Sequence, residues 1–430
     1  MIRIESKRNK FTYNIYHIVK AFYPGEDVEQ KVDGQQESLV TLYMPGDSSF
    51  SVFSEEIGLP SVEDPDEQRL QEEKWAVTRR VYQYLAEVNG GGLAWGILTG
   101  VRPTKLIMQK IEAGIGREEI LRSFQEEDFV SSEKAELAYE IACREHELLS
   151  RLDCAEGFSL YVGIPFCPSV CSYCSFSSSP IDQWRDRVDG YLDALVKEIR
   201  ALGKMAAGRK PDTVYIGGGT PTTLEPEQLD RLLSTITECF DISRALEFTI
   251  EAGRPDSITE EKLRVIRKYP VTRISVNPQT MQQKTLDLVG RRHTVKDVVN
   301  AFQMARKLGF DNINMDLIAG LPGENAEDMR DTLSRVKELG PDSLTVHALA
   351  IKRAAKFGQE GRTAELHSEI SQMVEEASRC ARSMSLQPYY LYRQKNIAGN
   401  FENVGYAEVD KAGIYNILIM EEKQTILAAG

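Results

Sequence analysis

Between residues 160 and 347 the chain alternates short apolar runs with stretches of helical length, and this repetition constrains the fold most. The apolar runs predict six strands, at Leu160–Ile164, Thr213–Ile216, Glu247–Glu251, Arg273–Val276, Asn312–Leu317 and Ser343–His347. Helices are expected between them, over Trp184–Ala207, Pro226–Cys239, Thr259–Tyr269, Val295–Leu308 and Ala326–Leu339. Such a strand–helix repeat predicts a parallel sheet with right-handed crossovers, and six strands fit a partial (β/α)6 barrel.

Residues that can bind ligands stand at the ends of these expected strands. A cysteine run follows the first strand, Gly217–Gly219 follow the second, and Glu251 ends the third. Gln279 follows the fourth strand, and Asp316 lies near the end of the fifth. In barrels of this class the chemistry lies at the carboxyl ends of the strands, so these residues are expected to form one site.

The cysteine run contains Cys167, Cys171 and Cys174, with the spacing C-x3-C-x2-C. Three thiolates placed in this way can bind three irons of a [4Fe–4S] cluster and leave the fourth iron open to a small ligand. Clusters that only carry electrons usually take four cysteines. The positions that follow, Ser175 and Phe176, supply no fourth cysteine nearby.

Zinc and disulfides are the alternatives for these cysteines. A structural zinc site needs four ligands, usually in pairs of Cys or His, and none of the five histidines pairs with the run. The histidines are His17, His146, His293, His347 and His367. A disulfide framework does not suit a chain this long with seven cysteines. The other four, Cys143, Cys154, Cys239 and Cys380, stand singly, as small buried residues often do.

The glycine run has a physical role of its own. Without side chains, Gly217–Gly219 let the backbone approach a ligand closely and present its N–H and C=O groups. The structural alternative is a tight turn between a strand and a helix. The cysteine run upstream favours the ligand-binding interpretation.

Composition limits the class of partner and the compartment. The chain has 430 residues, of which 42% are hydrophobic and 27% charged, as in a soluble globular protein. Its net charge of −13 argues against a nucleic-acid partner, which usually requires a basic face. We find no apolar run of transmembrane length and no signal peptide, so a cytoplasmic location without membrane contact is expected.

The flanking regions are expected to be mixed α/β. Alternation predicts strands at 11–19 and 38–44 in the N-terminal region, and a helix is expected to end near Val88. Thr99 or Thr104 is expected to cap the next helix, and two further helices lead to a linker at 153–157.

Beyond the sixth strand the pattern predicts a helix over 363–384, and strands at 388–392 and 415–420. The domains are therefore expected at 1–155, an N-terminal α+β domain of unknown role, at 156–350, the barrel, and at 351–430, a C-terminal α+β extension.

The sequence resembles the radical S-adenosylmethionine (SAM) enzymes. Its longer similarity is to their oxygen-independent coproporphyrinogen III oxidase family, including the haem chaperones, and within it to the coproporphyrinogen dehydrogenase-like branch. The similarity covers roughly residues 158–420. It rests on the runs YVGIPFCPSVCSYCSF, YIGGGTPT, FTIEAGRPD, ISVNPQTM, LVGRRHT, NMDLIAGLPGE and PYYLYRQKNIAGNFENVGYA. Relatives continue further, so the resemblance implies an extension cut short at residue 430.

The resemblance implies two cofactors, a [4Fe–4S] cluster on Cys167, Cys171 and Cys174 and SAM on its open iron. It also implies that SAM is bound by the glycine edge, by two tyrosines and by groups that hold the ribose and the methionyl carboxylate. These residues are Tyr161, Tyr173, Gly217, Gly218, Gly219, Thr220, Glu251, Gln279, Arg291 and Asp316. Without the resemblance, a core aromatic is the better explanation for the two tyrosines, a helix cap for Glu251 and Asp316, and a surface ion for Arg291.

The activity implied is the oxidative decarboxylation of coproporphyrinogen III to protoporphyrinogen IX, with a donor such as flavodoxin or ferredoxin supplying electrons. Candidate anchors for the substrate carboxylates are Arg102, Lys105, Lys352, Arg353, Arg393 and Lys395. Gly163 and Phe176 stand where well-studied oxidases carry His and Cys, and CSYCSF is closer to the chaperone relatives. A haem-binding chaperone with His347 as ligand is therefore the main alternative. A tRNA-modifying radical enzyme is a third, although residues 1–142 contain no cysteine for a second cluster.

Overall fold

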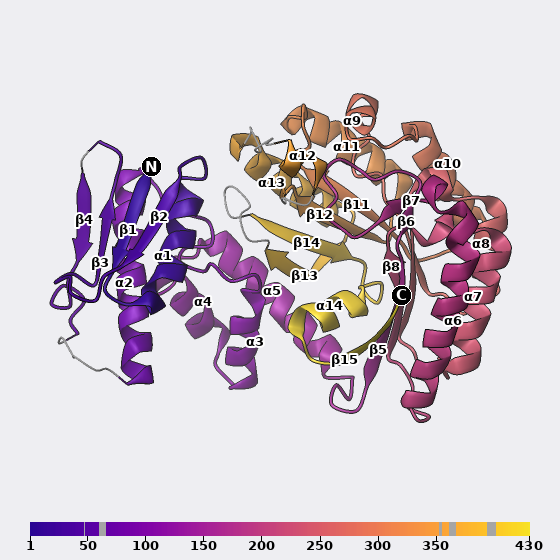
Figure 1. Ribbon diagram of the computed structural model, residues 1–430, viewed down its shortest axis with the longest axis horizontal. Coiled ribbons are helices and arrows are strands. Elements are labelled where there is room, and N and C mark those ends of the chain that lie inside the picture. Colours follow the sequence, from indigo (N-terminus) through magenta and orange to yellow (C-terminus); the bar gives the residue numbers. More distant parts are fainter. Residues whose placement is uncertain (47, 60–65, 352–354, 361–366, 394–400) are drawn as a thin grey trace. The chain divides into compact units, whose positions relative to one another are not determined.

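A computed structural model describes residues 1–430 except 47, 60–65, 352–354, 361–366 and 394–400 (Figure 1). The described residues divide into two compact units. The first contains residues 1–140 and 393–402, and the second contains residues 141–392 and 403–430. The predicted boundaries near 155 and 350 stay predictions.

The first unit contains a four-stranded sheet in the order β2-β1-β3-β4. Its strands are β1 (Ile2–Ser6), β2 (Val28–Val32), β3 (Val40–Tyr43) and β4 (Ser49–Val52). Strands β1 and β2 are parallel, and the other pairs are antiparallel. The helices that begin in this unit are α1 (Asn9–Phe22), α2 (Glu67–Val88), α3 (Thr104–Glu112), α4 (Arg117–Glu126) and α5 (Ser132–Leu149). The predicted strand at 38–44 and the helix ending at Val88 are confirmed. The predicted cap by Thr99 or Thr104 is wrong, because Pro103 is the N-cap of α3 and, among the described residues, no side chain caps this helix.

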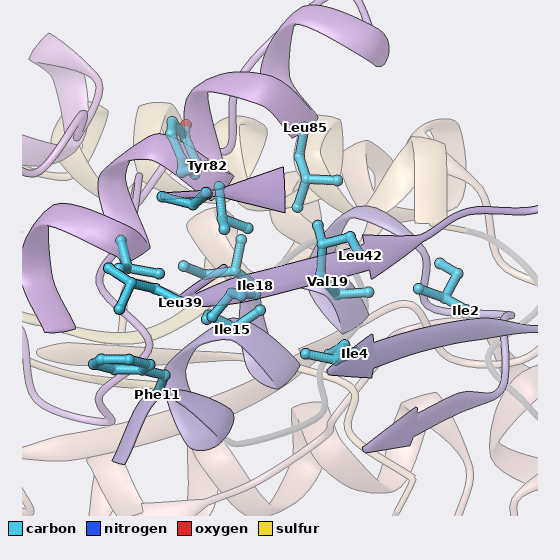
Figure 2. Close-up of a cluster of buried hydrophobic side chains, with 14 of the residues drawn as sticks. Ile2, Ile4, Phe11, Ile15, Ile18, Val19, Leu39, Leu42, Tyr82 and Leu85 are labelled. Carbon is cyan, nitrogen blue, oxygen red and sulfur yellow. The ribbon is translucent and has the colours of Figure 1, made fainter. Parts of the chain in front are cut away.

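The predicted strand at 11–19 is wrong, because these residues belong to helix α1. Phe11, Ile15, Ile18 and Val19 are buried, and their spacing of three to four residues places them on one side of a helix. Figure 2 shows them packed toward Leu42 of β3 and Ile4 of β1. Tertiary packing instead selected the helical period.

The second unit is built on six parallel strands, as the sequence predicts. They are β5 (Phe158–Ile164), β8 (Thr213–Gly218), β9 (Glu247–Gly253), β10 (Arg273–Val276), β11 (Ile313–Ala319) and β12 (Ser343–Ala348). The crossover helices are α6 (Val188–Met205), α7 (Pro226–Cys239), α8 (Glu260–Arg267), α10 (Val295–Lys307) and α11 (Ala326–Leu339). Helices α6, α7 and α8 cover the outer side of the curved sheet (Figure 1). The fold is a partial (β/α)6 barrel.

Short elements connect the strands and helices of the barrel. Two-residue strands β6 (Phe166–Cys167) and β7 (Ser179–Pro180) pair with each other beyond β5. Helix α9 (Gln283–Leu288) lies between β10 and α10. Single 3-10 turns occupy Ile181–Gln183, Arg185–Arg187, Pro221–Thr223 and Pro255–Ser257.

Additional strands extend the sheet at both edges, which gives nine strands in the order β13-β14-β12-β11-β10-β9-β8-β5-β15. Strands β13 (Gln387–Arg393) and β14 (Glu402–Ala407) follow β12, with β14 antiparallel to it. At the opposite edge β15 (Thr425–Ala429) pairs in parallel with β5. The remaining helices of the C-terminal part are α12 (Lys356–Gln359), α13 (His367–Ser383) and α14 (Ile414–Glu421). The predicted strand at 388–392 is confirmed.

The predicted strand at 415–420 is wrong, because these residues form helix α14. Tyr415, Leu418 and Glu421 are buried at intervals of three residues, and Ile417 is buried between them. A short apolar run does not by itself distinguish a strand from a buried helix. Here the packing of Tyr415 against Tyr161 and Tyr215 inside the barrel decides the outcome.

Within the part of the chain that the structure describes, no helix is both long and apolar enough to cross a membrane.

Candidate functional site

The three cysteines of the motif lie on the loop that follows β5. Cys167 ends β6, Cys171 is buried, and all three thiols are free of disulfides. The Cys174 amide donates to the Cys171 carbonyl at 3.0 Å, which closes a tight turn between two of the sulfurs. Ser172 N donates to Val289 O at 3.0 Å, so the loop is fixed to the end of α9.

Two buried guanidinium groups approach the central cysteine. Arg254 Nη1 lies 3.5 Å from Cys171 Sγ, and Arg291 Nη1 lies 3.8 Å from the same sulfur. Arg291 also donates to the Tyr173 hydroxyl at 3.3 Å and to Asn277 O at 2.6 Å. Arg291 and Tyr173 were predicted from the sequence, but Arg254 was not, although it stands in the run FTIEAGRPD directly after β9.

The glycine run closes the end of β8 against the cysteine loop. Gly219 N donates to Ile164 O at 2.8 Å, and Thr220 N donates to Phe166 O at 2.7 Å. A Cβ atom on Gly219 would lie 2.5 Å from Phe166 O, and Gly218 has a φ of +103°. The Thr220 hydroxyl lies 3.5 Å from Cys167 Sγ. Only glycine permits this approach, which brings the glycine edge and the cysteines together.

Gln279 and Asp316 are held together by the backbone. Gln279 N donates to Asp316 O at 2.9 Å, and Ile318 N donates to Gln279 O at 2.9 Å. Gln279 adopts a φ of +67°, which is strained for a residue with a side chain. Among the described residues, Gln279 Oε1 and Arg291 Nε are buried without a hydrogen-bond partner. Orphaned polar atoms at a strand end are what a polar ligand would satisfy.

Glu251 is an unusually basic carboxylate in the barrel. It accepts a hydrogen bond from the Tyr215 hydroxyl, and burial raises its pKa to about 7. Tyr215 stacks on Tyr415 with ring centroids 4.4 Å apart, and Tyr161 stacks on Tyr215 at 6.3 Å. The three rings form an aromatic layer beside Glu251. Tyr215 and Tyr415 were not named from the sequence, because nothing in their local pattern distinguishes them from core aromatics.

A second cluster of polar side chains lies on and beside β11 and β12. Asn314 Nδ2 donates to Asp316 Oδ1 at 2.7 Å, and His347 Nε2 lies 4.0 Å from Asp316 Oδ2. Tyr392 Oη lies 3.3 Å from His347 Nδ1. Burial lowers the pKa of His347, with the Asp316 charge opposing it, so the imidazole is neutral at physiological pH. Neutral imidazole is the form that binds a metal.

The residues fit an iron–sulfur cluster better than a single ion. In the described parts of the chain, no three His, Cys, Asp or Glu side chains converge on one point as single-ion ligands would. Cluster ligands need not converge in this way, because each thiolate binds a different iron. The three free cysteines, the guanidinium donors beside Cys171 and the glycine edge all suit a buried, electron-accepting cluster with a polar ligand.

Comparisons with known proteins bear directly on this site. The model of the Radical SAM superfamily matches residues 161–336. The oxygen-independent coproporphyrinogen-III oxidase-like protein HemZ of Bacillus subtilis is 43% identical over 342 residues, which cover 78% of this chain and 68% of HemZ. The chain belongs to the oxygen-independent coproporphyrinogen III oxidase-like family of radical SAM proteins. As in that family, its cofactors are a [4Fe–4S] cluster and SAM.

Other relatives in this family carry different names. The heme chaperone HemW of Bacillus subtilis is 36% identical over 212 residues, which cover 49% of this chain and 55% of HemW. The solved structure of coproporphyrinogen III oxidase HemN from Escherichia coli matches with a TM-score of 0.54 and 26% identity, over 66% of each chain. The chain thus spans about half of the HemW relative and two thirds of the oxidase structure.

The structure limits the candidate anchors for the substrate. The Arg393 side chain is 2% exposed, donates to the carbonyls of Leu98 and Gly100, and lies over the Trp95 ring at 5.4 Å. A guanidinium held in this way has a structural role, so we do not propose Arg393 as an anchor for the substrate carboxylates. Arg102 and Lys105, in the first unit, stay predictions. The other three anchors, Lys352, Arg353 and Lys395, lie outside the described residues.

Proposed function

We propose that this protein catalyses the oxygen-independent oxidative decarboxylation of coproporphyrinogen III to protoporphyrinogen IX. The observation that supports it is the contact of the buried Arg291 guanidinium with Cys171, together with the glycine edge bonded to the same loop, in a chain related to HemZ over most of its length. A cytoplasmic location, and flavodoxin or ferredoxin as electron donor, belong to the same proposal.

The chemistry supplied by the two cofactors is the reductive cleavage of SAM to methionine and a 5′-deoxyadenosyl radical, which removes hydrogen from an unactivated carbon. In the proposed reaction a propionate β-carbon of the substrate loses hydrogen. CO2 then leaves, one electron passes to an acceptor, and a vinyl group remains. Cys167, Cys171 and Cys174 are proposed to hold the cluster.

The residues around the loop are proposed to orient SAM. The backbone of Gly217–Thr220 would receive the methionyl amino group, and the Arg291 fork suits the methionyl carboxylate. Gln279 Oε1, buried and unpartnered among the described residues, offers an acceptor beside it. Glu251 and Asp316 would accept hydrogen bonds from the ribose hydroxyls, and Tyr161 and Tyr173 would pack against the adenosyl part.

Haem binding is the second candidate function. His347 is 26% exposed, is neutral, and lies in a wall with Tyr392 and Tyr390, whose rings stack at 6.2 Å. A neutral imidazole beside stacked aromatics suits an axial iron ligand against a flat macrocycle. The relationship to the heme chaperone HemW adds support. A titration with haem is expected to give a sharp Soret band that is lost in His347→Ala if this function is present.

The deciding experiment is a product assay on anaerobically reconstituted, dithionite-reduced protein with SAM and coproporphyrinogen III. Chromatography follows 5′-deoxyadenosine and porphyrin products together. We expect both deoxyadenosine and divinyl product, and we expect Cys171→Ala to abolish both. Cys239→Ala, which changes a thiol on α7 far along the chain from the motif, is the matched control. Deoxyadenosine without any change in the tetrapyrrole would overturn the oxidase proposal and leave haem binding to be tested.

A further inference from the structure

Arg254 is a buried cation that is not among the residues proposed to bind SAM. It follows Gly253 at the end of β9, and its side chain is 4% exposed. A guanidinium cannot lose its proton at physiological pH, so burying one is costly unless every donor is paired. The position of its partners therefore indicates what the residue does.

All five N–H groups of Arg254 have an acceptor. Nε and Nη2 donate to the two carboxylate oxygens of Asp256, at 2.9 and 2.7 Å. Nη2 also donates to Ser169 Oγ at 3.1 Å. Nη1 donates to Ser169 O at 3.1 Å and points at Cys171 Sγ at 3.5 Å. The side chain thus joins the end of β9 to two residues of the cysteine loop.

The two halves of this contact set have different roles. Asp256 fixes the plane of the guanidinium by a two-point ion pair, which leaves the other edge no freedom to turn. The other edge of the guanidinium donates to Ser169 and contacts Cys171 Sγ. Ser169 in turn donates its hydroxyl to Gly290 O at 2.8 Å, so the loop is held from both sides.

Arg291 does not duplicate this role. Its Nη1 is farther from Cys171 Sγ, at 3.8 Å, and it also donates to Tyr173. In the part of the chain that the structure describes, no carboxylate forms an ion pair with Arg291 as Asp256 does with Arg254; Arg291 Nη2 donates to a backbone carbonyl, Asn277 O. Among the described residues, Arg291 Nε has no hydrogen-bond partner and remains for SAM, while every N–H group of Arg254 is engaged by Asp256 or the loop.

We propose that Arg254 is a positioning residue for the cluster, which fixes Cys171 and makes the cluster easier to reduce. An N–H donor and a fixed positive charge beside a thiolate ligand stabilise the extra negative charge of the reduced cluster, and hydrogen bonds to sulfur are a recognised determinant of cluster potential. The inference rests on the cluster and is independent of the tetrapyrrole substrate.

The test compares Arg254→Gln and Arg254→Lys with wild type after anaerobic reconstitution. Iron and sulfide contents measure loading, and an EPR-monitored redox titration without SAM or substrate measures the potential. Arg264→Gln is the control, because Arg264 is 63% exposed on α8, where it pairs with Glu260 of the same helix. We expect a more negative potential in Arg254→Gln, a smaller shift in the same direction in Arg254→Lys, and none in the control.

Loaded variants whose potential equals that of wild type would overturn the proposal. Loss of loading with an unchanged circular dichroism spectrum would support the positioning role, because Arg254 touches no iron itself. A measurement that keeps Arg254 in place covers the case in which neither Arg254 variant folds. Pulsed EPR of the reduced cluster in wild type and Arg291→Lys, both labelled with 15N-arginine, is expected to show coupling to arginine nitrogen in both proteins. Loss of the coupling in Arg291→Lys, or its absence in wild type, would refute the contact of Arg254 with Cys171.

Discussion

The hydroxyl of Tyr215 on β8 donates to Glu251 on β9, and this bond lies inside the barrel beside the glycine edge. The hydrogen bond lowers the pKa of Glu251, but burial has the larger effect and raises this pKa to about 7 from an ordinary value of 4.5. The folded protein therefore binds a proton on Glu251 that the unfolded chain has released. The stability that this proton contributes is fully present below pH 4.5 and is lost as pH rises through about 7.

Replacing Glu251 by Gln is expected to remove this pH dependence. Chemical unfolding of wild type and Glu251→Gln at pH 5, 6, 7 and 8 measures it. The free energy of unfolding of wild type should decline relative to that of the variant across this window, because only wild type must bury a charge at high pH. Equal slopes for the two proteins would contradict the assignment. Tyr215→Phe should raise the pKa further and shift the decline to higher pH.

Gly219→Ala is expected to prevent cluster assembly. The new Cβ would lie 2.5 Å from Phe166 O and 2.8 Å from Ile164 O, so the glycine edge must move away from the cysteine loop. Overpacking of this kind costs about 1–3 kcal/mol of stability. Iron and sulfide content and urea unfolding measure the two effects. Gly190→Ala is the control, because nothing lies within 4 Å of a Cβ there.

Lys134→Met is expected to destabilise the first unit by about 3–5 kcal/mol, because it leaves a buried charge uncompensated. Lys134 Nζ lies 2.7 Å from Glu402 Oε1, and the Glu402 side chain is 1% exposed. The Trp95 indole donates to the other oxygen at 2.8 Å. The double variant Lys134→Met/Glu402→Gln should recover much of the loss. Denaturant unfolding measures all three proteins, and a mild single-variant effect would argue against the buried pair.

Glu145→Leu is expected to stabilise the second unit by about 1 kcal/mol or more at pH 8, because it removes an unpaired buried carboxylate. Neither carboxylate oxygen of Glu145 has a hydrogen-bond partner among the described residues. Burial and the nearby Glu421 raise its pKa well above the ordinary value. The gain should shrink toward pH 5, where Glu145 is protonated. Glu147→Leu, at an exposed position of the same helix, should show no such pH dependence.

The barrel could be predicted from the sequence because its signal is repeated. Each predicted strand, such as Thr213–Ile216 within β8, is a short apolar run followed by a helix with a clear polar face. Errors arose where a single short element stood alone. Phe11–Val19 and Tyr415–Met420 both contain aromatics and β-branched residues, which favour strands locally, yet both are helices held by burial against other elements.

The residues of the site that belong to sequence motifs could be predicted. The cysteines, the glycines and Arg291 carry spacing or sequence context that local reasoning can use. Arg254 carries none, because its role depends on Ser169 and Cys171, which approach from a distant part of the chain. Tyr415 enters the barrel from the C-terminal part, more than 150 residues from Glu251, and no local pattern indicates that approach.

The pairing of β15 with β5 has a consequence for synthesis on the ribosome. Strand β5 leads directly into the cysteine loop, yet its outer edge pairs with residues 425–429, which are synthesised much later than residues 158–162. During translation β5 is made early, and its outer edge stays unpaired until β15 is available. Contacts this distant in sequence form slowly. The complete sheet beside the cysteine loop, and the fixed loop that cluster insertion requires, therefore form only after β15 has been synthesised.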